Sequence, residues 1–359
     1  MGNQMVHLMV AADKNMQSYL RMCSMRARRT TLLLYVLLLC VACAAAQSDP
    51  LPSWNNDSTK QAILDFIARV SKQGGPDFVP VEARIATFDN DGTLWTEQPV
   101  YTEYAFTFDR VKQLASQHPE WKTEQPYAAV LQNDMKALAA SGDRGAFQLI
   151  LATHAGMSTD QFSQIVTEWI NHAEHPKFHR PYTECIYQPM VELLTFMRAN
   201  GFKTYIVSGG EVEFMRPWTE KTYGIPPEQV IGTTLKTKYE LNGANPALER
   251  QPEIDSIDDG PGKPENIGKI IGRRPIAAFG NSDGDQQMLE WTAAGGGPRL
   301  MALVHHTDAQ REYSYDRASS VGRLDKALDE ATARQWLVID MKNDWKVIFP
   351  PGPTVPDSH

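Results

Sequence analysis

The chain has 359 residues, of which 42% are hydrophobic and 22% charged, with 24 Gly and 23 Pro. This ordinary globular composition excludes collagen-like, low-complexity and coiled-coil proteins, and the length favours about two domains. The 35 basic and 43 acidic residues give a formal net charge of −8. Because nucleic-acid binders usually carry a basic balance or a basic stripe, we expect no nucleic-acid partner.

Residues 1–46 have the pattern of a secretory signal peptide. The basic pair Arg28 and Arg29 precedes an apolar run at residues 32–43, and three alanines follow this run. The run is shorter than the ~20 residues that span a bilayer. We therefore expect an exported chain, periplasmic or secreted, with no transmembrane span after processing. A lipid anchor at Cys43 is an open alternative.

The first elements of the mature chain are a helix and a buried strand. Apolar residues recur on one face of the helix, at Ile63, Phe66, Ile67 and Val70. We expect Ser58 or Thr59 to cap this helix. A short apolar run at residues 84–88 predicts the strand, and an acidic turn at residues 89–93 follows it.

From about residue 104 to residue 175 the pattern predicts helices with no strand between them. Ser158 and Gln161 have the spacing of a capping box at the start of one helix. Strands and helices then alternate, beginning with a helix at residues 191–197 that stops at Gly201. The predicted strands are residues 203–207, 229–235, 275–279 and 300–304.

The end of the chain predicts a hairpin from residues 336–341 and 345–349. The preceding alternation predicts an α/β fold, namely a doubly wound parallel sheet with right-handed crossovers and a helical insert after the first strand. The predicted domains are a core at residues 47–95 and 189–349, the insert at residues 96–188, and a disordered tail at residues 350–359.

Polar clusters follow three of the predicted strands, at Asp89–Thr93, Ser208–Gly210 and Gly280–Asp285. A further cluster, Gly262–Pro264, opens the helix that leads into the strand before Gly280. In an open α/β sheet, ligands bind beyond the carboxyl ends of the strands. We therefore expect these clusters to share one cleft.

The four clusters, in this order, resemble the motifs of the haloacid dehalogenase-like (HAD) hydrolase superfamily, in particular its phosphoserine-phosphatase-like acid phosphatases. The resemblance covers roughly residues 84–306, and the helical insert lies where that group carries its cap. It implies a Rossmann-like core and an enzyme that hydrolyses small phosphorylated substrates, the phosphomonoesters.

The resemblance implies that Asp89 is the nucleophile, which attacks phosphorus and forms an aspartyl-phosphate. Asp91 would protonate the leaving alcohol and then deprotonate the hydrolytic water. The implied phosphate site consists of Thr93, Ser208, Gly209 and Lys263. Mg²⁺ is the implied cofactor, because a hard cation shields the nucleophile from the charge of the phosphate. Its implied ligands are Asp89, Asp91, Asn281 and Asp285.

The last motif departs from the family's pattern, because Asn281 stands where many relatives have an aspartate. An amide oxygen ligates Mg²⁺ without bringing charge, so the shares of Asp283 and Asp285 in the site stay open. Glu97 lies close to where phosphoserine phosphatases hold the substrate amine with a glutamate, although the register differs by one residue. We expect Glu97 to contact the substrate on this ground alone.

Two other functions stay open beside phosphomonoester hydrolysis. A phosphotransferase would pass the phosphoryl group from Asp89 to an alcohol other than water. A catalytically retired binding protein would have lost turnover, and Asn281 is the feature that favours it. Dehalogenase chemistry does not need a second acid, so Asp91 argues against that activity.

Overall fold

The computed structural model describes residues 49–352 with the exception of residue 244. All of them except Asp49 belong to one unit, Pro50–His359. The predicted signal peptide, its Cys43 and residues 353–359 of the predicted tail lie outside the described residues.

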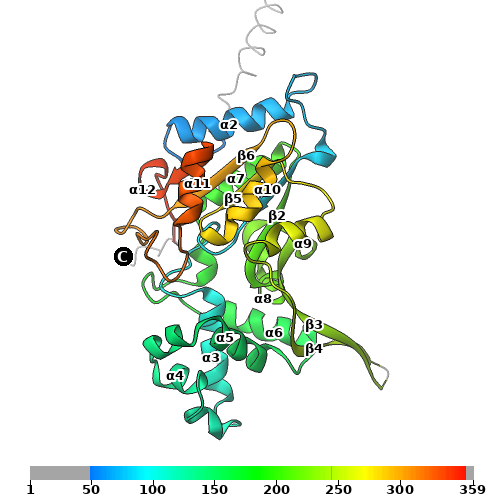
Figure 1. Cartoon of the computed structure of the whole chain (residues 1–359), viewed down its shortest axis with the longest axis vertical. Coiled ribbons are helices and arrows are strands. Elements are labelled where there is room, and N and C mark those ends of the chain that lie inside the picture. Colours follow the sequence, from blue (N-terminus) through cyan, green and yellow to red (C-terminus); the bar gives the residue numbers. More distant parts are fainter. Residues whose placement is uncertain (1–48, 244, 353–359) are drawn as a thin grey trace, which may run out of the picture. The chain divides into compact units, whose positions relative to one another are not determined.

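A sheet of seven strands in the order β4-β3-β2-β1-β5-β6-β7 forms the centre of this unit (Figure 1). All neighbouring strands pair in parallel except β3 and β4, which are antiparallel. The predicted α/β fold with a mostly parallel sheet is confirmed. The strands are β1 (Ile85–Phe88), β2 (Lys203–Glu211), β3 (Val230–Asn242), β4 (Asn245–Ser256), β5 (Ala277–Gly280), β6 (Leu300–His305) and β7 (Leu337–Asp340).

Helices connect and cover these strands. Every residue of the central strand β1 is buried, as expected for a parallel strand with helices on both faces. The helices are α2 (Ser58–Ser71), α3 (Thr102–Leu114), α4 (Tyr127–Gln132), α5 (Met135–His154), α6 (Thr159–Ile170), α7 (Gln188–Ala199), α8 (Val212–Tyr223), α9 (Gly262–Ile270), α10 (Gln286–Ala293), α11 (Lys326–Arg334) and α12 (Met341–Asp344). Among the described residues, no helix is both long and apolar enough to cross a membrane.

The first predicted helix is present as α2, but its cap differs from the prediction. Asp57 is the N-cap, and its side chain accepts a hydrogen bond from the Lys60 N–H at 2.9 Å. The expectation of Ser58 or Thr59 was wrong because an aspartate one position earlier satisfies the same backbone donors. At the start of α6, the predicted capping box of Ser158 and Gln161 is confirmed.

Helices α3 to α6 follow β1 in the chain and gather at one end of Figure 1. They have a hydrophobic cluster of their own, which contains Val111, Trp121, Tyr127, Val130 and Leu149. Phe106 of α3 and Phe162 of α6, by contrast, pack into the main core beside the sheet. The helical insert therefore rests on the sheet domain through α3 and α6, while its boundaries at residues 96–188 stay a prediction.

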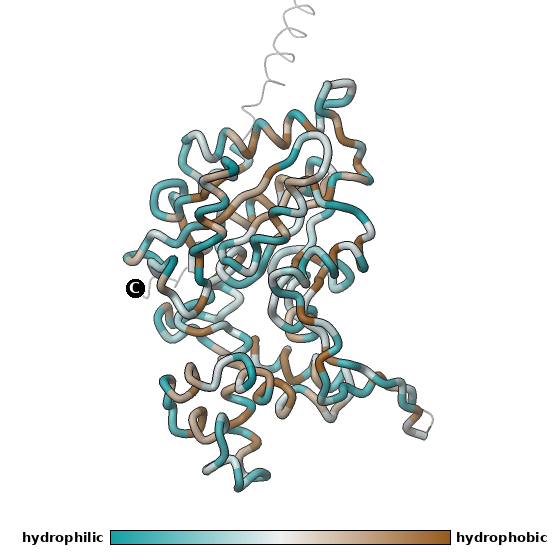
Figure 2. The backbone as a smooth tube through the Cα atoms, in the orientation of Figure 1, coloured by the Kyte–Doolittle hydropathy of each residue, from teal (hydrophilic) through white to brown (hydrophobic). Residues whose placement is uncertain are grey.

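Two strand predictions need correction. The strand that was expected to end before Ser208 continues to Glu211, because the register between β2 and β3 shifts there and pairing resumes at Thr233. The strand β4 was not predicted at all. Its sequence lacks a clear apolar alternation, and the tip of the β3–β4 hairpin is largely hydrophilic in Figure 2.

The predicted terminal hairpin is wrong. Residues 337–340 form β7, which pairs in parallel with β6. The short helix α12 follows it directly, because the Asp340 side chain accepts hydrogen bonds from the Lys342 and Asn343 N–H groups. The chain therefore turns into a helix where the sequence suggested a hairpin turn.

Candidate active site

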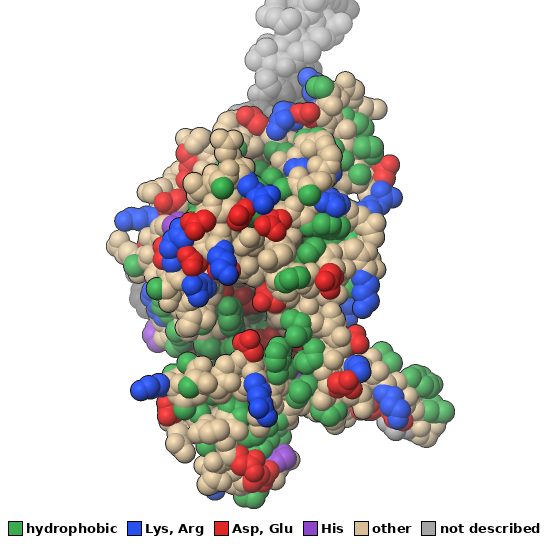
Figure 3. All heavy atoms as spheres, viewed as in Figure 1, with side chains coloured by type: hydrophobic (Ala, Val, Ile, Leu, Met, Phe, Trp, Pro, Cys, Tyr) green, Lys and Arg blue, Asp and Glu red, His purple; other side chains and the backbone are tan. Residues whose placement is uncertain are grey.

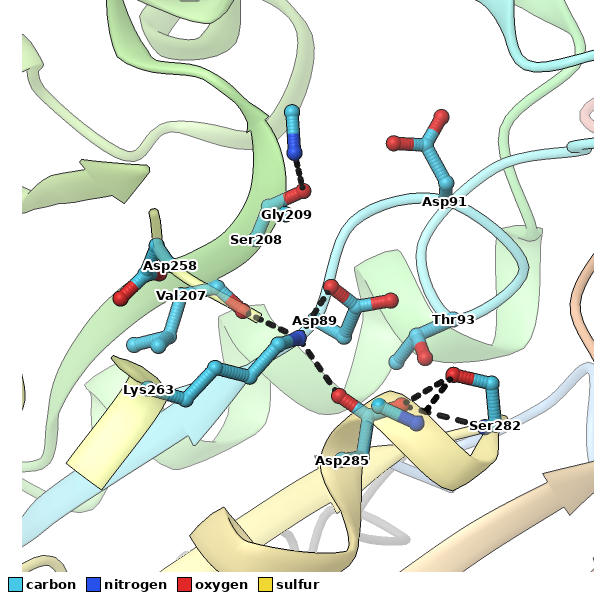
Figure 4. A network of polar contacts seen from close by, with 12 residues as sticks. Asp89, Asp91, Thr93, Val207, Ser208, Gly209, Asp258, Lys263, Ser282 and Asp285 are labelled. Carbon is cyan, nitrogen blue, oxygen red and sulfur yellow. Dashed lines mark hydrogen bonds and ion pairs between the residues drawn. The ribbon is translucent and has the colours of Figure 1, made fainter. Parts of the chain in front are cut away.

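The predicted site residues meet at the carboxyl ends of three neighbouring strands (Figure 4). The central strand β1 lies between β2 and β5, and Phe88 at its end is paired with Ile206 and Phe279. The next residues along these strands therefore share one edge of the sheet. This edge is where an open α/β sheet binds its ligands.

Lys263, near the start of α9, holds this edge together. Its Nζ donates hydrogen bonds to Asp89 Oδ1 at 2.7 Å, to Asp285 Oδ1 at 2.6 Å and to the Val207 main-chain oxygen at 2.9 Å (Figure 4). An ammonium has three hydrogens, so all its donors are engaged. Burial lowers the pKa of Lys263, but the charges of Asp285 and Asp89 outweigh burial and raise it, so the side chain stays charged.

Asp89 follows β1 and is only 6% exposed. Burial and the negative charge of Asp285 raise its pKa well above the ordinary value, while Lys263 acts in the opposite direction. Lys263 engages Oδ1, and the other carboxylate oxygen, Oδ2, has no hydrogen-bond partner among the described residues. That oxygen is placed to act on a ligand.

Asp91 lies two residues further along and has different surroundings. Trp95 donates from Nε1 to Asp91 Oδ1 at 2.8 Å. Trp95 itself is buried and stacks on Trp218, with 4.4 Å between the ring centroids. Burial raises the pKa of Asp91 to about 6. Figure 4 shows its carboxylate pointing away from Lys263, whereas that of Asp89 points toward it. Two carboxylates with such different surroundings can divide acid–base and nucleophilic roles.

The turn between these two acids and Trp95 depends on Gly92. Its φ of +73° favours glycine, and a Cβ there would lie 2.1 Å from Asn281 Nδ2. Asn281 Nδ2 donates to Glu97 Oε1 at 2.7 Å, and Asn281 Oδ1 accepts from Thr93 Oγ1 at 3.0 Å. The Asn281 amide is thus fixed, with its oxygen toward Thr93 and its nitrogen toward Glu97.

Glu97 is almost completely buried and also accepts a hydrogen bond from the Tyr315 hydroxyl at 2.7 Å. Burial raises its pKa well above the ordinary value. The contacts with Asn281 and Tyr315 give Glu97 a positioning role in this structure, and its predicted contact with substrate stays a prediction.

Asp285 supports the loop after β5 with both carboxylate oxygens. Oδ1 accepts from Lys263, and Oδ2 accepts from the N–H groups of Asn281 and Ser282 at 2.9 and 3.1 Å. A Cβ at Gly280 would lie within 2.5 Å of the Asp285 side chain, so the glycine permits this close approach. Asp285 therefore orients the loop that carries Asn281.

The predicted phosphate-binding residues divide into two groups. Thr93 and Lys263 have their donors engaged by Asn281 and by the buried carboxylates. The Ser208 hydroxyl accepts from the Gly210 N–H at 3.2 Å and has no acceptor for its own proton among the described residues. Gly209 is exposed beside it, so this part of β2 presents polar groups to a ligand.

The site fits a hard divalent cation. In the buried network, Lys263 brings one positive charge. Four carboxylates lie within the network or border it, namely those of Asp89, Asp91, Glu97 and Asp285. The ligand atoms that these residues offer are oxygens, namely the free Asp89 carboxylate oxygen and the Asn281 carboxamide oxygen, which also accepts from Thr93. Oxygen donors of this kind suit Mg²⁺. Figure 3 shows a hollow with acidic side chains between the sheet part and the helical insert.

Several residues that support the site were not predicted in that role. His306 Nε2 donates to the Gly92 main-chain oxygen at 2.8 Å and so holds the acidic turn. The Tyr223 hydroxyl donates to Asn90 Oδ1 at 3.2 Å. Asp258 is fully buried near Lys263, and burial raises its pKa to about 6. No local motif marks His306 and Tyr223, because their partners Gly92 and Asn90 are distant in the sequence.

An open α/β sheet with a lysine-bridged acidic site at its strand ends defines the class of this protein. The chain belongs to the haloacid dehalogenase-like hydrolase family, whose model matches residues 86–290. The resemblance seen in the sequence is thereby confirmed.

The chain is similar to several solved structures. A protein of unknown function from Bordetella pertussis Tohama I has 16% identity, with 72% of this chain and 98% of that chain covered and a TM-score of 0.46. A functionally unknown protein from Anaerococcus prevotii has 16% identity, 71% and 87% coverage and a TM-score of 0.49. A phosphoserine phosphohydrolase-like protein from Francisella tularensis has 16% identity, 62% and 87% coverage and a TM-score of 0.35. No curated protein matches the chain.

Proposed function

We propose that this chain is a Mg²⁺-dependent phosphatase that hydrolyses small phosphomonoesters through an aspartyl-phosphate on Asp89. The observation that carries the proposal is the buried Lys263 ammonium between Asp89 and Asp285, which leaves Asp89 Oδ2 free at the edge of the sheet. Membership of the hydrolase family supports it.

In the first half-reaction, Asp89 Oδ2 attacks phosphorus and the bond from phosphorus to the leaving oxygen breaks. Asp91 gives its proton to that oxygen, so the alcohol leaves neutral. In the second half, Asp91 takes a proton from water, whose oxygen attacks the same phosphorus. The bond to Asp89 then breaks and inorganic phosphate leaves.

The remaining residues of the site orient the phosphoryl group and control charge. The Ser208 hydroxyl donates to a phosphate oxygen, and the Lys263 ammonium acts against the rise in the Asp89 pKa and so favours the ionised form. Asp89, the Asp91 main-chain oxygen and Asn281 would hold Mg²⁺, whose charge would shield the phosphate from the carboxylates. Asp285 orients Asn281 and Lys263 for these tasks.

The direct test is phosphate release from a panel of phosphomonoesters by the purified mature chain, with Mg²⁺ and with chelator. We expect release that chelator removes and Mg²⁺ restores. Asp89→Asn should abolish it, whereas Asp77→Asn, a change in a surface ion pair with Arg69, should not. Full release in chelator by metal-free protein would contradict the proposal. Phosphoryl transfer to an added alcohol, in place of hydrolysis, would show a phosphotransferase.

We also propose that the protein is exported, on the pattern of residues 1–46. The mature chain should begin near Gln47, or at a lipid-modified Cys43. N-terminal sequencing of protein from the producing cells tests this. An intact leader on protein recovered from the cytosol would overturn it.

A further inference from the structure

A second group of polar side chains lies beside the proposed catalytic site and takes no part in it. Glu103 belongs to α3, His154 ends α5, and Glu211 ends β2. One ligand atom of each lies within 4.8 Å of the others, and all three side chains are buried. Three separate elements therefore bring one imidazole and two carboxylates together.

Each of the three side chains also has a second polar atom, which is not one of the grouped ligand atoms and which has a partner of its own. Glu103 Oε2 accepts from the Glu211 N–H at 2.8 Å. Glu211 Oε1 pairs with the buried Arg250 guanidinium, and His154 Nε2 lies 3.2 Å from Thr107 Oγ1. Metal ligands in proteins are typically oriented in this way by a partner on the atom that does not bind the ion.

The Thr107 contacts assign the protons of His154. The Thr107 hydroxyl donates to the Glu103 main-chain oxygen at 2.8 Å, so toward His154 it accepts from Nε2–H. In the neutral ring, the lone pair is then on Nδ1, which lies 2.8 Å from Glu211 Oε2. Two acceptors at this distance need a cation or a proton between them.

The oxygen Glu103 Oε1 gives a second indication of an ion, separate from the grouping of the three side chains. It is buried, has no hydrogen-bond partner among the described residues, and lies 3.9 Å from His154 Nδ1. A buried carboxylate oxygen without a partner is costly. The buried Arg250 guanidinium pairs with Glu211 Oε1 and makes no hydrogen bond with Glu103 Oε1.

We propose that Glu103 Oε1, His154 Nδ1 and Glu211 Oε2 bind a divalent transition-metal ion, such as Zn²⁺ or Mn²⁺. An imidazole nitrogen with two carboxylates suits these ions better than Mg²⁺, which prefers oxygen ligands. The ion fastens α3 and α5 of the helical insert to the end of β2. This site is separate from the Mg²⁺ site proposed at Asp89.

Gly210 lies close to both this group and the Asp91 side chain. A Cβ on Gly210 would lie 3.1 Å from Glu103 Oε2 and 3.7 Å from Asp91 Oδ2, so glycine leaves this space open. The metal centre thus borders the catalytic cleft on the side of Asp91. An ion there also adds positive charge beside the proposed general acid.

The test measures Zn²⁺ and Mn²⁺ binding by calorimetry and by elemental analysis after gel filtration, on the full chain carrying Asp89→Asn. This background removes a ligand of the proposed Mg²⁺ site, so the two metal sites are distinguished without any activity assay. We expect one bound Zn²⁺ that excess Mg²⁺ does not displace. His154→Gln in the same background should weaken binding by at least about tenfold.

His172→Gln is the matched control, because His172 is exposed on the surface after α6 and should leave binding unchanged. Glu103→Gln is a second test variant, which keeps shape and should also weaken binding at least about tenfold. Cobalt substitution should give visible absorption bands that both test variants lose. Zn²⁺ binding that is absent, or equal in wild type and in either folded test variant, would overturn the proposal.

Discussion

Lys263 is the residue on which the acidic site depends. It is 2% exposed and pairs with two carboxylates, of which one is the proposed nucleophile and the other supports the Asn281 loop. An ion pair buried to this extent is costly to break from one side, because the remaining charges lose their partner. Lys263 therefore links the stability of the site to its chemistry.

Replacing this residue by Lys263→Met should lower the free energy of unfolding by about 3 kcal/mol, because Asp89 and Asp285 would stay buried without a cation. It should also abolish phosphate release. Urea unfolding at neutral pH measures the first effect. Lys269→Met, an exposed position on the same helix, should change stability by less than about 0.5 kcal/mol. Equal stability of the two variants would contradict the role of Lys263.

Asp91 should determine how the first half-reaction depends on pH. Burial raises its pKa to about 6. The protonated form, which acts as the acid, is lost as pH rises through this value. The rate of phosphoenzyme formation should therefore fall above about pH 6 for substrates whose leaving alcohol needs a proton. Rapid-mixing kinetics across this pH range measure the rate.

Asp91→Asn should remove this pH dependence and slow the step by about 10²–10⁴-fold. Substrates with an acidic leaving group, such as aryl phosphates, should suffer less because they leave without a proton. If the fall in rate above pH 6 persists unchanged in Asp91→Asn, another group is the acid.

At the scale of elements, the acidic turn after β1 depends on the space that Gly92 leaves for Asn281. Gly92 and Gly74 have nearly the same φ, +73° and +75°, but a Cβ at Gly74 would have nothing within 4 Å. Both Gly→Ala variants should incur backbone strain of about 1–2 kcal/mol. Gly92→Ala should lose at least about 2 kcal/mol more of its unfolding free energy, because its Cβ would overlap the Asn281 side chain. It should also lose turnover.

Thermal unfolding and phosphate release of the two alanine variants measure this difference. The Gly74 variant reports backbone strain alone. If both variants unfold at the same temperature, the close approach of the turn and the β5 loop does not matter for stability.

The loops after β1 and β5 are also coupled through Glu97 and Asn281. Asn281→Asp replaces the N–H donor to Glu97 by a carboxylate oxygen, so two buried carboxylates would face each other. We expect a loss of about 1–3 kcal/mol in unfolding free energy. Glu97→Gln should restore much of it in the double variant, because a glutamine can donate to the new aspartate.

A double-mutant cycle of unfolding free energies measures this coupling. Mg²⁺ calorimetry is the second readout. The double variant should bind the ion more tightly than wild type, since the new carboxylate brings the charge that Asn281 lacks. Additive free energies would show that the two side chains do not interact.

The sequence predicted the elements whose signals are local. The strands β1 and β5 are short, fully buried apolar runs, and β6 is a half-buried apolar run. The capping box of Ser158 is a local contact. The hairpin strand β4 was missed, because its polar sequence forms a strand only through pairing with β3. The terminal hairpin failed because capping by Asp340 started a helix.

The site residues also divide into those that a local sequence pattern marked and those that it did not. Motif spacing identified Asp89, Asp91, Lys263 and the loop after β5, which the fold brings to one edge of the sheet. It did not reveal that Glu97 orients Asn281, or that Glu103 and Glu211 meet His154. These contacts join segments more than 40 residues apart, so no local sequence pattern indicates them.

At the scale of the whole molecule, the helical insert and the sheet domain share a packed core. Phe106 and Phe162 of the insert belong to the same hydrophobic cluster as Phe214 of α8, and Phe106 lies 5.4 Å from Phe214 between ring centroids. Figure 3 shows the hollow with acidic side chains between the sheet part and the helical insert.

The central claim is that Asp89 carries the phosphoryl group during turnover. Wild-type protein mixed with a phosphomonoester and Mg²⁺ should be quenched in acid within the first turnover and digested for peptide mass spectrometry. We predict one phosphoryl group on the peptide that contains Asp89, at that side chain, and none in Asp89→Asn. Phosphate release by wild-type protein with no phosphoryl group on Asp89 at any quench time would contradict the account.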